Sequence, residues 1–451
     1  MAHAEKVYKV RKGEKLKAFT WRARYKRPDG TWGSEPGFPT KGTALQWGEE
    51  QEAAIRAGRW IDPDLQRMTF GEFAKKWMKA KPKRGATVAK RWNVLEQHIL
   101  PKWQHTPMVS INWFDVDSWQ QALPCDEVTA GHAVSLMSSI LTGAVDAKHL
   151  TVNPLYARRR TRATAGTAAA GATKKKSDEE KWARPEVVLQ MAERLGPAIG
   201  LHVLTTAFTG LGWGESAGLH RDNVLRTRRQ PYDGGWFECP VIRVDPDVGE
   251  LAEYEGRDED GNKTGLVLQL EPPKNAGRAR DIDVPPFLAQ LLRRHLADWP
   301  HEYVFCTPGG KFWRRSNFTR SNIRPAADGR DALPTVKGHR PRPAWEPIMP
   351  GLTMRDLRHT HDTYQDQIGV RPALMFEQAG HKRPGIKAVY QHPTPAMRQE
   401  RLDGLQDIYL RAMHNLGWRT LWGRVDLTRG PRAPRPTNIP QTINGDQGRA
   451  A

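Results

Sequence analysis

Basic side chains and two tyrosines lie in residues 352–401, and their types suit chemistry on a phosphate; of the two tyrosines, Tyr364 is expected to be structural. Arg355 and Arg358 lie close together at the start of a predicted helix, and their planar guanidinium groups match the oxygens of a phosphate. His381 follows a glycine, and a histidine that titrates near neutral pH can move a proton. Tyr390 stands nine residues later. A tyrosine hydroxyl that such groups hold in place becomes a nucleophile.

These motifs resemble the active-site signature of tyrosine recombinases of the lambda-integrase type. In that family His-x-x-Arg is followed by Gly-His and then, nine or ten residues on, by a tyrosine. This chain has Arg355-Asp-Leu-Arg358, then Gly380-His381, then Tyr390, in the same order and spacing. The resemblance extends over nearly the whole chain, because the segments before residue 182 also look like the family's DNA-binding modules.

The resemblance implies a catalytic set and a mechanism. Tyr390 would attack the scissile phosphorus, leaving a 3′-phosphotyrosyl link that needs neither ATP nor metal for rejoining. Arg358 would be the main clamp on the phosphate, helped by Arg355 and His381, since donors aimed at the developing charge lower the barrier. The family's lysine falls on Lys274, in the segment Pro-Lys-Asn-Ala-Gly-Arg-Ala-Arg, and would protonate the departing 5′ oxygen. No cofactor is expected.

Two departures from the family pattern bear on activity. The first box normally reads Thr-Gly-Leu-Arg-x-Gly-Glu, but here residues 209–215 read Thr-Gly-Leu-Gly-Trp-Gly-Glu, so the first catalytic arginine falls on Gly212. The family's histidine in His-x-x-Arg falls on Arg355. Our hypothesis is that Arg355 partly restores the lost positive charge, with Arg221 as a second candidate. The alternative is a protein that keeps the fold and binds DNA but no longer cleaves it.

A third hypothesis, a metal-dependent nuclease, rests on His359 and His361. Residues two apart do not share one face of a helix. No cysteine or glutamate motif that would complete a metal site accompanies them. We therefore expect no metal site here.

The sequence predicts a multidomain fold. We expect a small sheet with one helix, an all-α core-binding domain, and a mixed, mainly helical catalytic domain with a small antiparallel sheet. The predicted boundaries are 1–65 for an arm-type DNA-binding module, 66–156 for the helical domain, 157–181 for a basic flexible linker, 182–415 for the catalytic domain and 416–451 for a basic disordered tail.

Periodicity predicts the elements that position these residues. In the first module a strand covers 17–27, and a helix runs from Thr40 or Thr43 to about Ala57. In the second domain one helix covers 88–100 and ends at Pro101. The catalytic domain has expected helices over 185–195, 200–209 and 285–297, strands over 241–244, 266–270 and 280–284, and a solvated acidic loop over 245–260.

Two basic stretches are candidates for DNA contact. Along the first strand, three basic residues point to one face, which is either a DNA-binding surface or a solvated sheet: Arg22, Arg24 and Lys26. The linker is rich in Arg, Lys, Ala, Gly and Thr and could follow a phosphate backbone, with these residues as candidates: Arg158, Arg159, Arg160, Lys174 and Lys175.

Composition supports a polyanionic partner. The chain of 451 residues carries 70 Lys and Arg against 50 Asp and Glu, a net charge of +20, and each phosphate neutralised releases counterions. We expect double-stranded DNA attachment sites, a homotetramer, a possible accessory directionality factor, and no membrane, because no apolar run reaches the roughly 18 residues that spanning needs. Three scattered cysteines and an N-terminus without a signal-peptide core suggest the cytoplasm, in association with the nucleoid.

Overall fold

The computed structural model describes residues 1–11, 14–63, 67–80, 84–156, 182–258, 261–334, 341–381, 392–423 and 425–426. Its chain divides into two compact units, Met1–Thr164 with Glu255–Gly265, and Ala165–Tyr254 with Leu266–Ala451. The protein has a mixed α and β fold with small antiparallel sheets, as the sequence predicted. The predicted linker, 157–181, lies outside the described residues.

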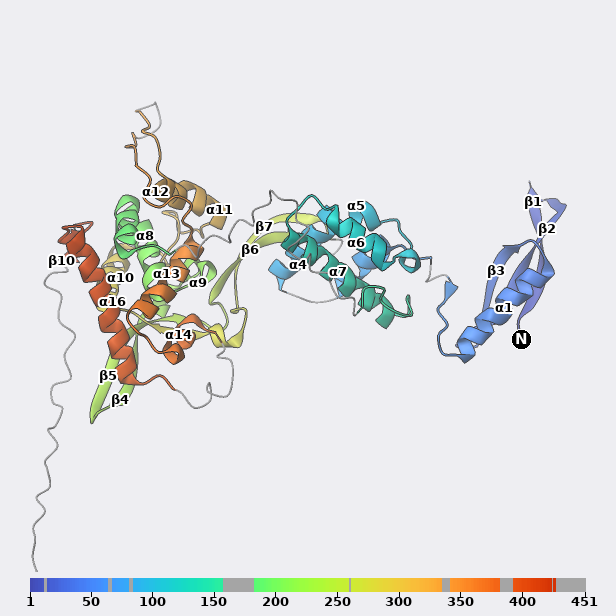
Figure 1. Ribbon diagram of the computed structural model, residues 1–451, viewed down its shortest axis with the longest axis horizontal. Coiled ribbons are helices and arrows are strands. Elements are labelled where there is room, and N and C mark those ends of the chain that lie inside the picture. The colour runs from blue at the N-terminus through green and yellow to red at the C-terminus, as the bar shows by residue number, and fades with distance from the viewer. Residues whose placement is uncertain are drawn as a thin grey trace, which may run out of the picture. The chain divides into compact units, whose positions relative to one another are not determined.

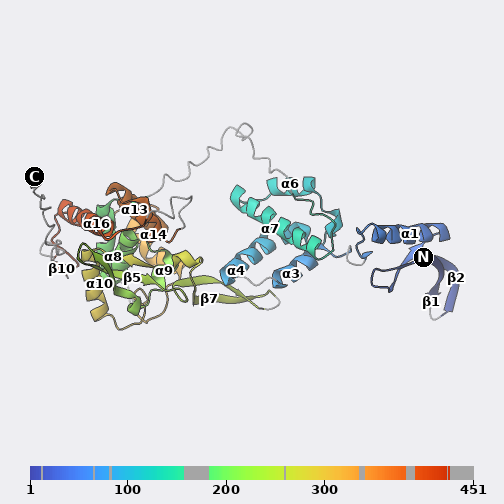
Figure 2. The same ribbon diagram turned by 90° about the horizontal axis from the view of Figure 1, so that it is seen from below.

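The N-terminal sheet forms where apolar and basic residues alternate. β1 (His3–Arg11), β2 (Glu14–Lys26) and β3 (Trp32–Phe38) pair antiparallel in that order, and α1 (Lys41–Arg56) covers one face (Figures 1 and 2). Ala23 and Tyr25 of β2 are buried, and Tyr25 meets Trp47 of α1 edge-on, with 5.5 Å between ring centroids. The predicted strand and helix are confirmed. β1 was not predicted, because charged residues dominate its sequence.

The helical part of the first unit begins at Phe70. Pro101 does not end the helix expected over 88–100, because it occupies the first turn of the next helix, where a missing backbone N–H is tolerated. Apolar residues of several helices meet in one core, including Trp92, Trp119 and Met137. The elements are α3 (Phe70–Ala80), α4 (Gly85–Val94), η1 (Leu95–Ile99), α5 (Leu100–Trp103), η2 (Met108–Ser110), α6 (Trp113–Gln121) and α7 (Glu127–Asp146).

Among the described residues, α7 alone is long and apolar enough to cross a membrane, with a mean hydropathy of 1.3 over its window. No such segment was predicted from the sequence. Half of that window is buried inside the protein, and Ala133, Met137 and Ile140 belong to the core of the helical part. These features are typical of a core helix, and a single such helix is weak evidence for a membrane span.

In the second unit, α8 (Pro185–Thr209) contacts α10 (Pro286–Asp298), α13 (Met354–Gln367) and α16 (Pro395–Asn415). Gly196 has a φ of 73° and breaks the helix just before Pro197, so the two predicted helices are confirmed as the halves of one kinked element. The remaining helices are short: α9 (Trp213–Ala217), η3 (Arg221–Asn223), η4 (Ala276–Arg278), α11 (Arg315–Phe318), η5 (Thr319–Ile323), α12 (Arg324–Asp328) and α14 (Pro372–Ala379).

Small antiparallel sheets flank these helices. One has the order β4-β5-β8, and β6 pairs with β7 in another. The three predicted strands are confirmed within β5, β7 and β8, but the expected acidic loop over 245–260 is wrong, because β6 occupies part of it and buries Leu251. The strands are β4 (Val224–Tyr232), β5 (Gly235–Val244), β6 (Glu250–Arg257), β7 (Lys263–Glu271) and β8 (Arg280–Asp283).

The folded chain continues past the start of the tail predicted over 416–451. β9 (Thr420–Leu421) pairs with β10 (Val425–Asp426), Leu421 is buried, and the Trp422 indole N–H donates to the Ala192 carbonyl at 3.0 Å. These contacts correct the prediction for the first residues of that segment. Residues 427–451 lie outside the described part.

A buried ion cluster ties the sheet to α16. The fully buried Asp283 carboxylate accepts hydrogen bonds from Arg228 (2.7 Å), Arg398 (3.0 Å) and Arg401 (2.5 Å). Burial acts to raise the pKa of Asp283, but the surrounding guanidinium groups, that of Arg401 first, outweigh it and hold the pKa below its ordinary value. Arg398 also donates to Glu377 of α14 at 2.6 Å. The cluster therefore joins β4, β8, α14 and α16.

We expect Asp283→Asn to destabilise the second unit by about 3–5 kcal/mol, because it leaves Arg401 buried without a carboxylate. Asp281→Asn, two residues earlier on β8, is the matched control: its partner Arg243 is partly exposed, and such a pair is worth about 1 kcal/mol or less. Calorimetric melting at pH 7 measures both changes. The pKa of Asp283 is lowered in the folded state, so the stability that its charged form contributes is lost as the pH falls through that pKa. The difference in free energy of unfolding between wild type and Asp283→Asn should therefore become smaller in acid. Equal melting temperatures for the two variants would contradict the assignment.

Candidate active site

Arg358 projects from α13, a helix whose start is well defined. Thr353 caps it by accepting from the Asp356 N–H, while the Asp356 carboxylate accepts from the Thr353 N–H at 2.8 Å. This reciprocal pair satisfies donors that a helix N-terminus leaves open. Leu357 and Tyr364 are buried against the core, which leaves the Arg358 side chain at the border, 17% exposed.

A buried carboxylate holds the guanidinium of Arg358. Glu215 on α9 is 3% exposed, and its oxygens accept from Arg358 at 3.3 Å and from Arg280 at 2.9 and 3.2 Å. The Gly212 N–H adds a further hydrogen bond at 2.8 Å. Burial acts to raise the pKa of Glu215, but the two arginines and the N–H outweigh it and keep the pKa below its ordinary value. Glu215 is therefore an anion that fixes two cations.

Gly212 lies where a side chain would face Arg358. A Cβ built at Gly212 would stand 3.3 Å from Nη1 of Arg358 and 3.5 Å from Oε2 of Glu215. The predicted departure from the family pattern is thus located next to the main clamp residue. The position contributes a backbone N–H to Glu215 and no charge of its own.

The end of α14 places His381. Gly380 adopts a φ of 67°, and the His381 N–H donates to the Phe376 carbonyl at 3.0 Å, which is the bonding of a Schellman cap. The last carbonyls of this helix are bound by arginines: Arg280 donates to Gln378 at 2.6 Å and Arg358 to Ala379 at 3.1 Å. The same two arginines that bind Glu215 therefore fix the backbone just before His381.

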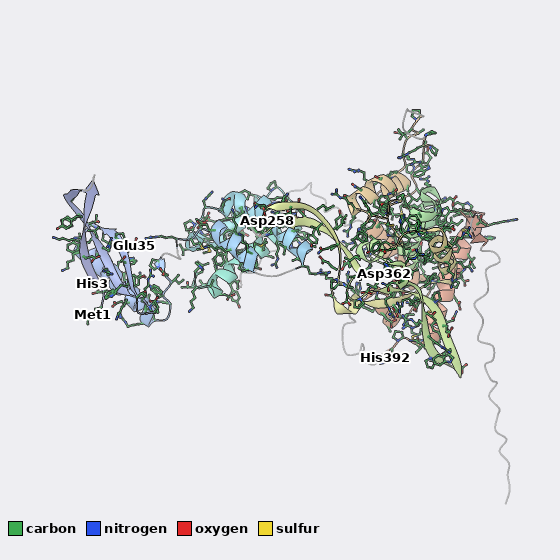
Figure 3. All side chains as sticks on the ribbon, turned by 180° about the vertical axis from the view of Figure 1, so that it is seen from behind. Met1, His3, Glu35, Asp258, Asp362 and His392 are labelled. Atoms are coloured by element: carbon green, nitrogen blue, oxygen red, sulfur yellow. The ribbon has the colours of Figure 1, made fainter. Side chains whose placement is uncertain are left out.

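Burial and the nearby positive charges both lower the pKa of His381, which favours the neutral imidazole. Partial burial lowers its pKa below the ordinary value of 6.5, and the positive charges of Arg358 and Arg278 lower it further, while Asp362 opposes them. Asp362 lies on α13 one turn beyond Arg358 (Figure 3). Burial raises the pKa of Asp362, although Arg358 acts in the other direction. A neutral histidine beside arginines can accept a proton or hydrogen-bond an oxygen.

Two further candidate residues, Lys274 and Arg355, have exposed side chains. Lys274 lies in the loop between β7 and β8, which are not paired with each other. Its side chain is exposed, and its N–H donates to Glu250 at 3.2 Å. Arg355 is exposed and donates to the His359 ring at 3.4 Å. Tyr390 lies outside the described residues.

Arg221 is not part of this cluster, which corrects its nomination as a supplier of charge. Its guanidinium donates to the carbonyls of Leu296, Trp299 and His301 at 3.1 to 3.4 Å. These carbonyls lie at the end of α10 and just beyond it, where a helix favours a cation. Sequence proximity to the first box gave no sign of this role.

The histidines of the metal hypothesis differ in setting. His361 is 1% exposed, and its ring packs under Gly210, where a built Cβ would come within 2.7 Å. Burial, reinforced by Arg401 and Arg358, lowers the pKa of His361 to about 3. In the described part of the chain, no group of three or more His, Cys, Asp or Glu side chains could hold a metal ion.

The predicted basic face of the N-terminal sheet is partly neutralised. Glu5 on β1 accepts from Arg22 at 3.2 Å and lies 3.8 Å from Arg24, whereas Lys26 is exposed. Both interpretations, DNA contact and solvated surface, stay open for this face. The linker candidates Arg158, Arg159, Arg160, Lys174 and Lys175 lie outside the described residues.

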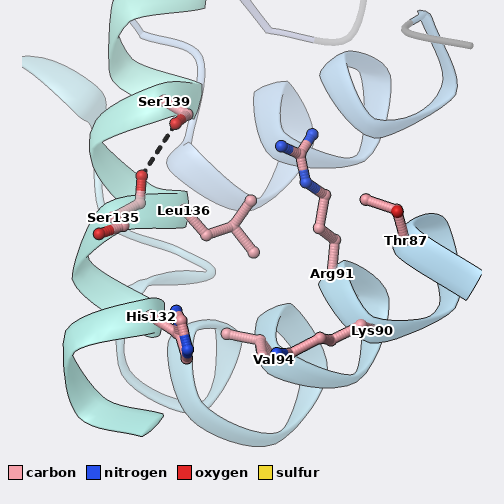
Figure 4. A pocket seen from close by; sticks show the side chains of 8 residues that line it. All are labelled: Thr87, Lys90, Arg91, Val94, His132, Ser135, Leu136 and Ser139. Carbon is pink, nitrogen blue, oxygen red and sulfur yellow. Dashed lines mark hydrogen bonds between the residues drawn. The ribbon is translucent and has the colours of Figure 1, made fainter. Parts of the chain in front are cut away.

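Sequence reasoning missed a basic pocket in the helical part of the first unit. It lies between α4 and α7 and encloses about 230 Å³. Figure 4 shows Lys90 and Arg91 on one side of the pocket and His132 on the other, with the Arg91 guanidinium directed away from His132. Hydroxyl groups complete the polar lining, from Thr87, Ser135 and Ser139. The run Ala-Lys-Arg-Trp in a predicted helix was the available signal.

An arginine pair fixed by a buried carboxylate lies next to a histidine with a lowered pKa, and this arrangement would suit a phosphate group. No protein-family model matches the chain. The integrase of Mycobacterium phage FRAT1 is 23% identical over 372 residues, covering 79% of this chain and 96% of that protein. The integrase of Mycobacterium phage D29 is 23% identical over 372 residues, covering 79% and 85%. These relatives confirm the resemblance to integrases that the motifs indicated.

Solved structures with similar folds include two DNA complexes. The Tn1549 transposon integrase in complex with transposon right end DNA has a TM-score of 0.48 at 15% identity, over 78% of this chain and 100% of that chain. A lambda integrase tetramer bound to a Holliday junction has a TM-score of 0.43 at 14% identity, over 80% and 93%.

We expect two substitutions to move the pKa of His381 in opposite directions. Arg278→Ala removes a positive charge that disfavours the imidazolium, so the pKa should rise, whereas Asp362→Asn removes a negative charge, so it should fall. Titration of the His381 ring protons by NMR measures both shifts, and Arg294→Ala, an exposed arginine on α10, is the control. If neither variant moved the pKa, the charge arrangement around His381 would be wrong.

Proposed function

We propose that this protein is a site-specific DNA recombinase of the tyrosine type, which cleaves and rejoins strands through a 3′-phosphotyrosine intermediate. The observation that carries the proposal is the Glu215 carboxylate holding Arg358 beside His381. That arrangement presents a fixed positive charge and a proton acceptor to one phosphate. The similarity to phage integrases over about four fifths of the chain supports the same reaction class.

In the proposed reaction the Tyr390 oxygen attacks the scissile phosphorus, and the bond to the 5′ oxygen breaks. Arg358 neutralises charge on the non-bridging oxygens, with Arg355 as a further donor from the rim. The lowered pKa of His381 favours the neutral imidazole, which can accept the phenolic proton. Lys274 gives a proton to the departing 5′ oxygen. Attack by a 5′ hydroxyl of a partner strand reverses these steps and restores the phosphodiester.

The proposed substrate is double-stranded DNA carrying the attachment sites of a mobile element, which the protein integrates or excises as a homotetramer, with an accessory directionality factor as a further partner. The net charge of +20 favours this polyanion. We place the activity in the cytoplasm, at the nucleoid. The proposed domains are those predicted from the sequence, except that the catalytic domain also includes the folded residues 416–423 and 425–426, and residues 1–65 contact arm-type sites.

A second candidate function is DNA binding without cleavage. The observation that favours it is Gly212, which gives no guanidinium at the position where the family has its first arginine. The two candidates share the fold and the DNA partner and differ only in whether a covalent link forms.

A nicked duplex distinguishes the two candidate functions. After cleavage the short fragment that carries the 5′ hydroxyl diffuses away, so the strand cannot be rejoined and the covalent intermediate accumulates. Nicked duplexes tiled across the element that encodes the protein supply the substrate. We expect a covalent protein–DNA adduct with wild-type protein in EDTA, and none with Tyr390→Phe, which lacks the attacking oxygen. Denaturing gels measure the adduct, and Tyr364→Phe is the matched control. Binding without an adduct would favour the non-catalytic candidate, and cleavage that chelation abolishes would favour a metal nuclease.

The pocket between α4 and α7 is proposed to bind a DNA phosphate, since Lys90 is exposed at its edge. Lys90→Ala should weaken binding to a synthetic duplex and reduce the slope of log K against log salt by about 0.9, the loss of one phosphate contact. Fluorescence anisotropy across a salt series measures the slope. Lys102→Ala, an exposed lysine outside the pocket on α5, is the control. If the slopes of log K against log salt were identical for Lys90→Ala and Lys102→Ala, the pocket would not be part of the DNA-binding surface.

A further inference from the structure

At Gly212 the candidate site lacks the guanidinium that the integrase pattern has at that position, and Arg278 lies on a turn close to the site. Phosphoryl transfer spreads negative charge over the non-bridging oxygens, and a single arginine fork binds only part of it. Gly212 provides none of the missing charge. The replacement must come from a cation that is close to Arg358 and His381 and is not already committed to a carboxylate.

The backbone of Arg278 lies close to Arg358 and His381, which is the first requirement. A Cβ built at Gly380 would lie 3.0 Å from the Arg278 Cα and 3.1 Å from the Gly277 carbonyl oxygen. The turn that carries Arg278 is therefore packed against the residue immediately before His381. The Arg278 carbonyl also accepts from Arg280 at 2.7 Å. Arg280 is itself held by Glu215, so the backbone at Arg278 is fixed by the same ion cluster that holds Arg358.

The second requirement is a cation that is not already paired with a carboxylate, and Arg278 meets it whereas Arg280 does not. Arg280 is 5% exposed and donates to Glu215, to Gln378 and to Arg278. Its guanidinium is therefore occupied by the protein. The Arg278 side chain is half-buried, and within the described part of the chain it has no hydrogen bond or ion pair with another side chain. Arg355 remains on the exposed side of α13, where it donates to His359.

We propose that Arg278 is a further catalytic residue, which binds the scissile phosphate together with Arg358 and takes over the role left vacant at Gly212. This inference rests on the proposed recombinase function and adds a phosphate ligand to that site. The guanidinium comes from the loop before β8 instead of the N-terminus of α9. The phosphate would therefore still meet a second guanidinium beside Arg358, but this guanidinium comes from position 278 instead of position 212.

The local charge balance supports this assignment. Arg278, Arg280 and Arg358 lie near one another, and Glu215 is the buried anion placed between two of them. The positive charge of Arg278 acts on Arg358 and on His381, lowering the pKa of both after the effect of burial. Like charges placed together disfavour one another until an anion arrives. A phosphodiester entering between Arg278 and Arg358 would relieve that repulsion.

The test measures covalent adduct on the nicked duplexes together with DNA affinity. Arg278→Ala should reduce the rate of adduct formation by about 10²–10³-fold, the usual effect of losing one transition-state donor, while affinity changes little. Arg278→Lys keeps the charge without the fork and should retain more activity than Arg278→Ala. Arg294→Ala, which removes an exposed arginine paired with Asp298 on α10, should cleave as wild type does.

A restoration experiment distinguishes catalysis from structural support. Gly212 has an ordinary φ of −70°, and a built Cβ there approaches only the flexible tip of Arg358 and the Glu215 carboxylate. Gly212→Arg combined with Arg278→Ala should therefore recover at least tenfold of the lost rate. Wild-type rates for Arg278→Ala, or a loss that Gly212→Arg does not restore, would overturn the proposal. Absence of any adduct with wild-type protein would instead refute the recombinase function itself.

Discussion

The carboxylate of Glu215 lies buried between two guanidinium groups, and the geometry of the candidate site depends on it. Placing this charge in the interior is costly unless partners surround it, so Glu215 draws Arg280, Arg358 and the Gly212 N–H toward one point. The two arginines then reach the last carbonyls of α14. One anion thereby sets the positions of α9, α13 and the residue before His381.

A second buried carboxylate fixes the elements on either side of the segment that contains Tyr390. Asp283 binds Arg398 and Arg401 in the first turns of α16, and Arg398 also binds Glu377 in α14. The ends of α14 and α16 that face residues 382–391 in the chain are therefore both held to β8. Loss of one partner in such a network leaves an uncompensated buried charge. The described ends of α14 and α16 are thus anchored to the same buried carboxylate.

Local sequence patterns predicted most helices and strands, whereas ion pairs between residues far apart in the sequence could not be predicted from it. Thr40, one of the two predicted start points of the first helix, is the N-cap of α1, and the helix predicted over 285–297 is α10, which begins at Pro286; both starts depend only on neighbouring residues. The expected loop over 245–260 failed because acidic residues hid the alternation of β6. The pairing of Glu215 with Arg280 spans 65 positions, and no local signal reports such a contact. Arg221 was misassigned for the same reason, while the motif that nominated Arg358 and His381 led to residues that the structure brings together.

The free energy needed to bury the charges of the Glu215 cluster is relevant to the question of whether the site has lost its catalytic function. A buried ion pair contributes little net stability, and an apolar replacement of similar volume is often neutral or stabilising. Stability alone therefore does not account for an acid at position 215 facing arginines at 280 and 358, with a further arginine at 278 on the adjoining turn. A structure that only bound DNA would need exposed cations and not a desolvated, oriented pair. The orientation is useful where negative charge develops at a defined point, as it does at a phosphorus atom under attack.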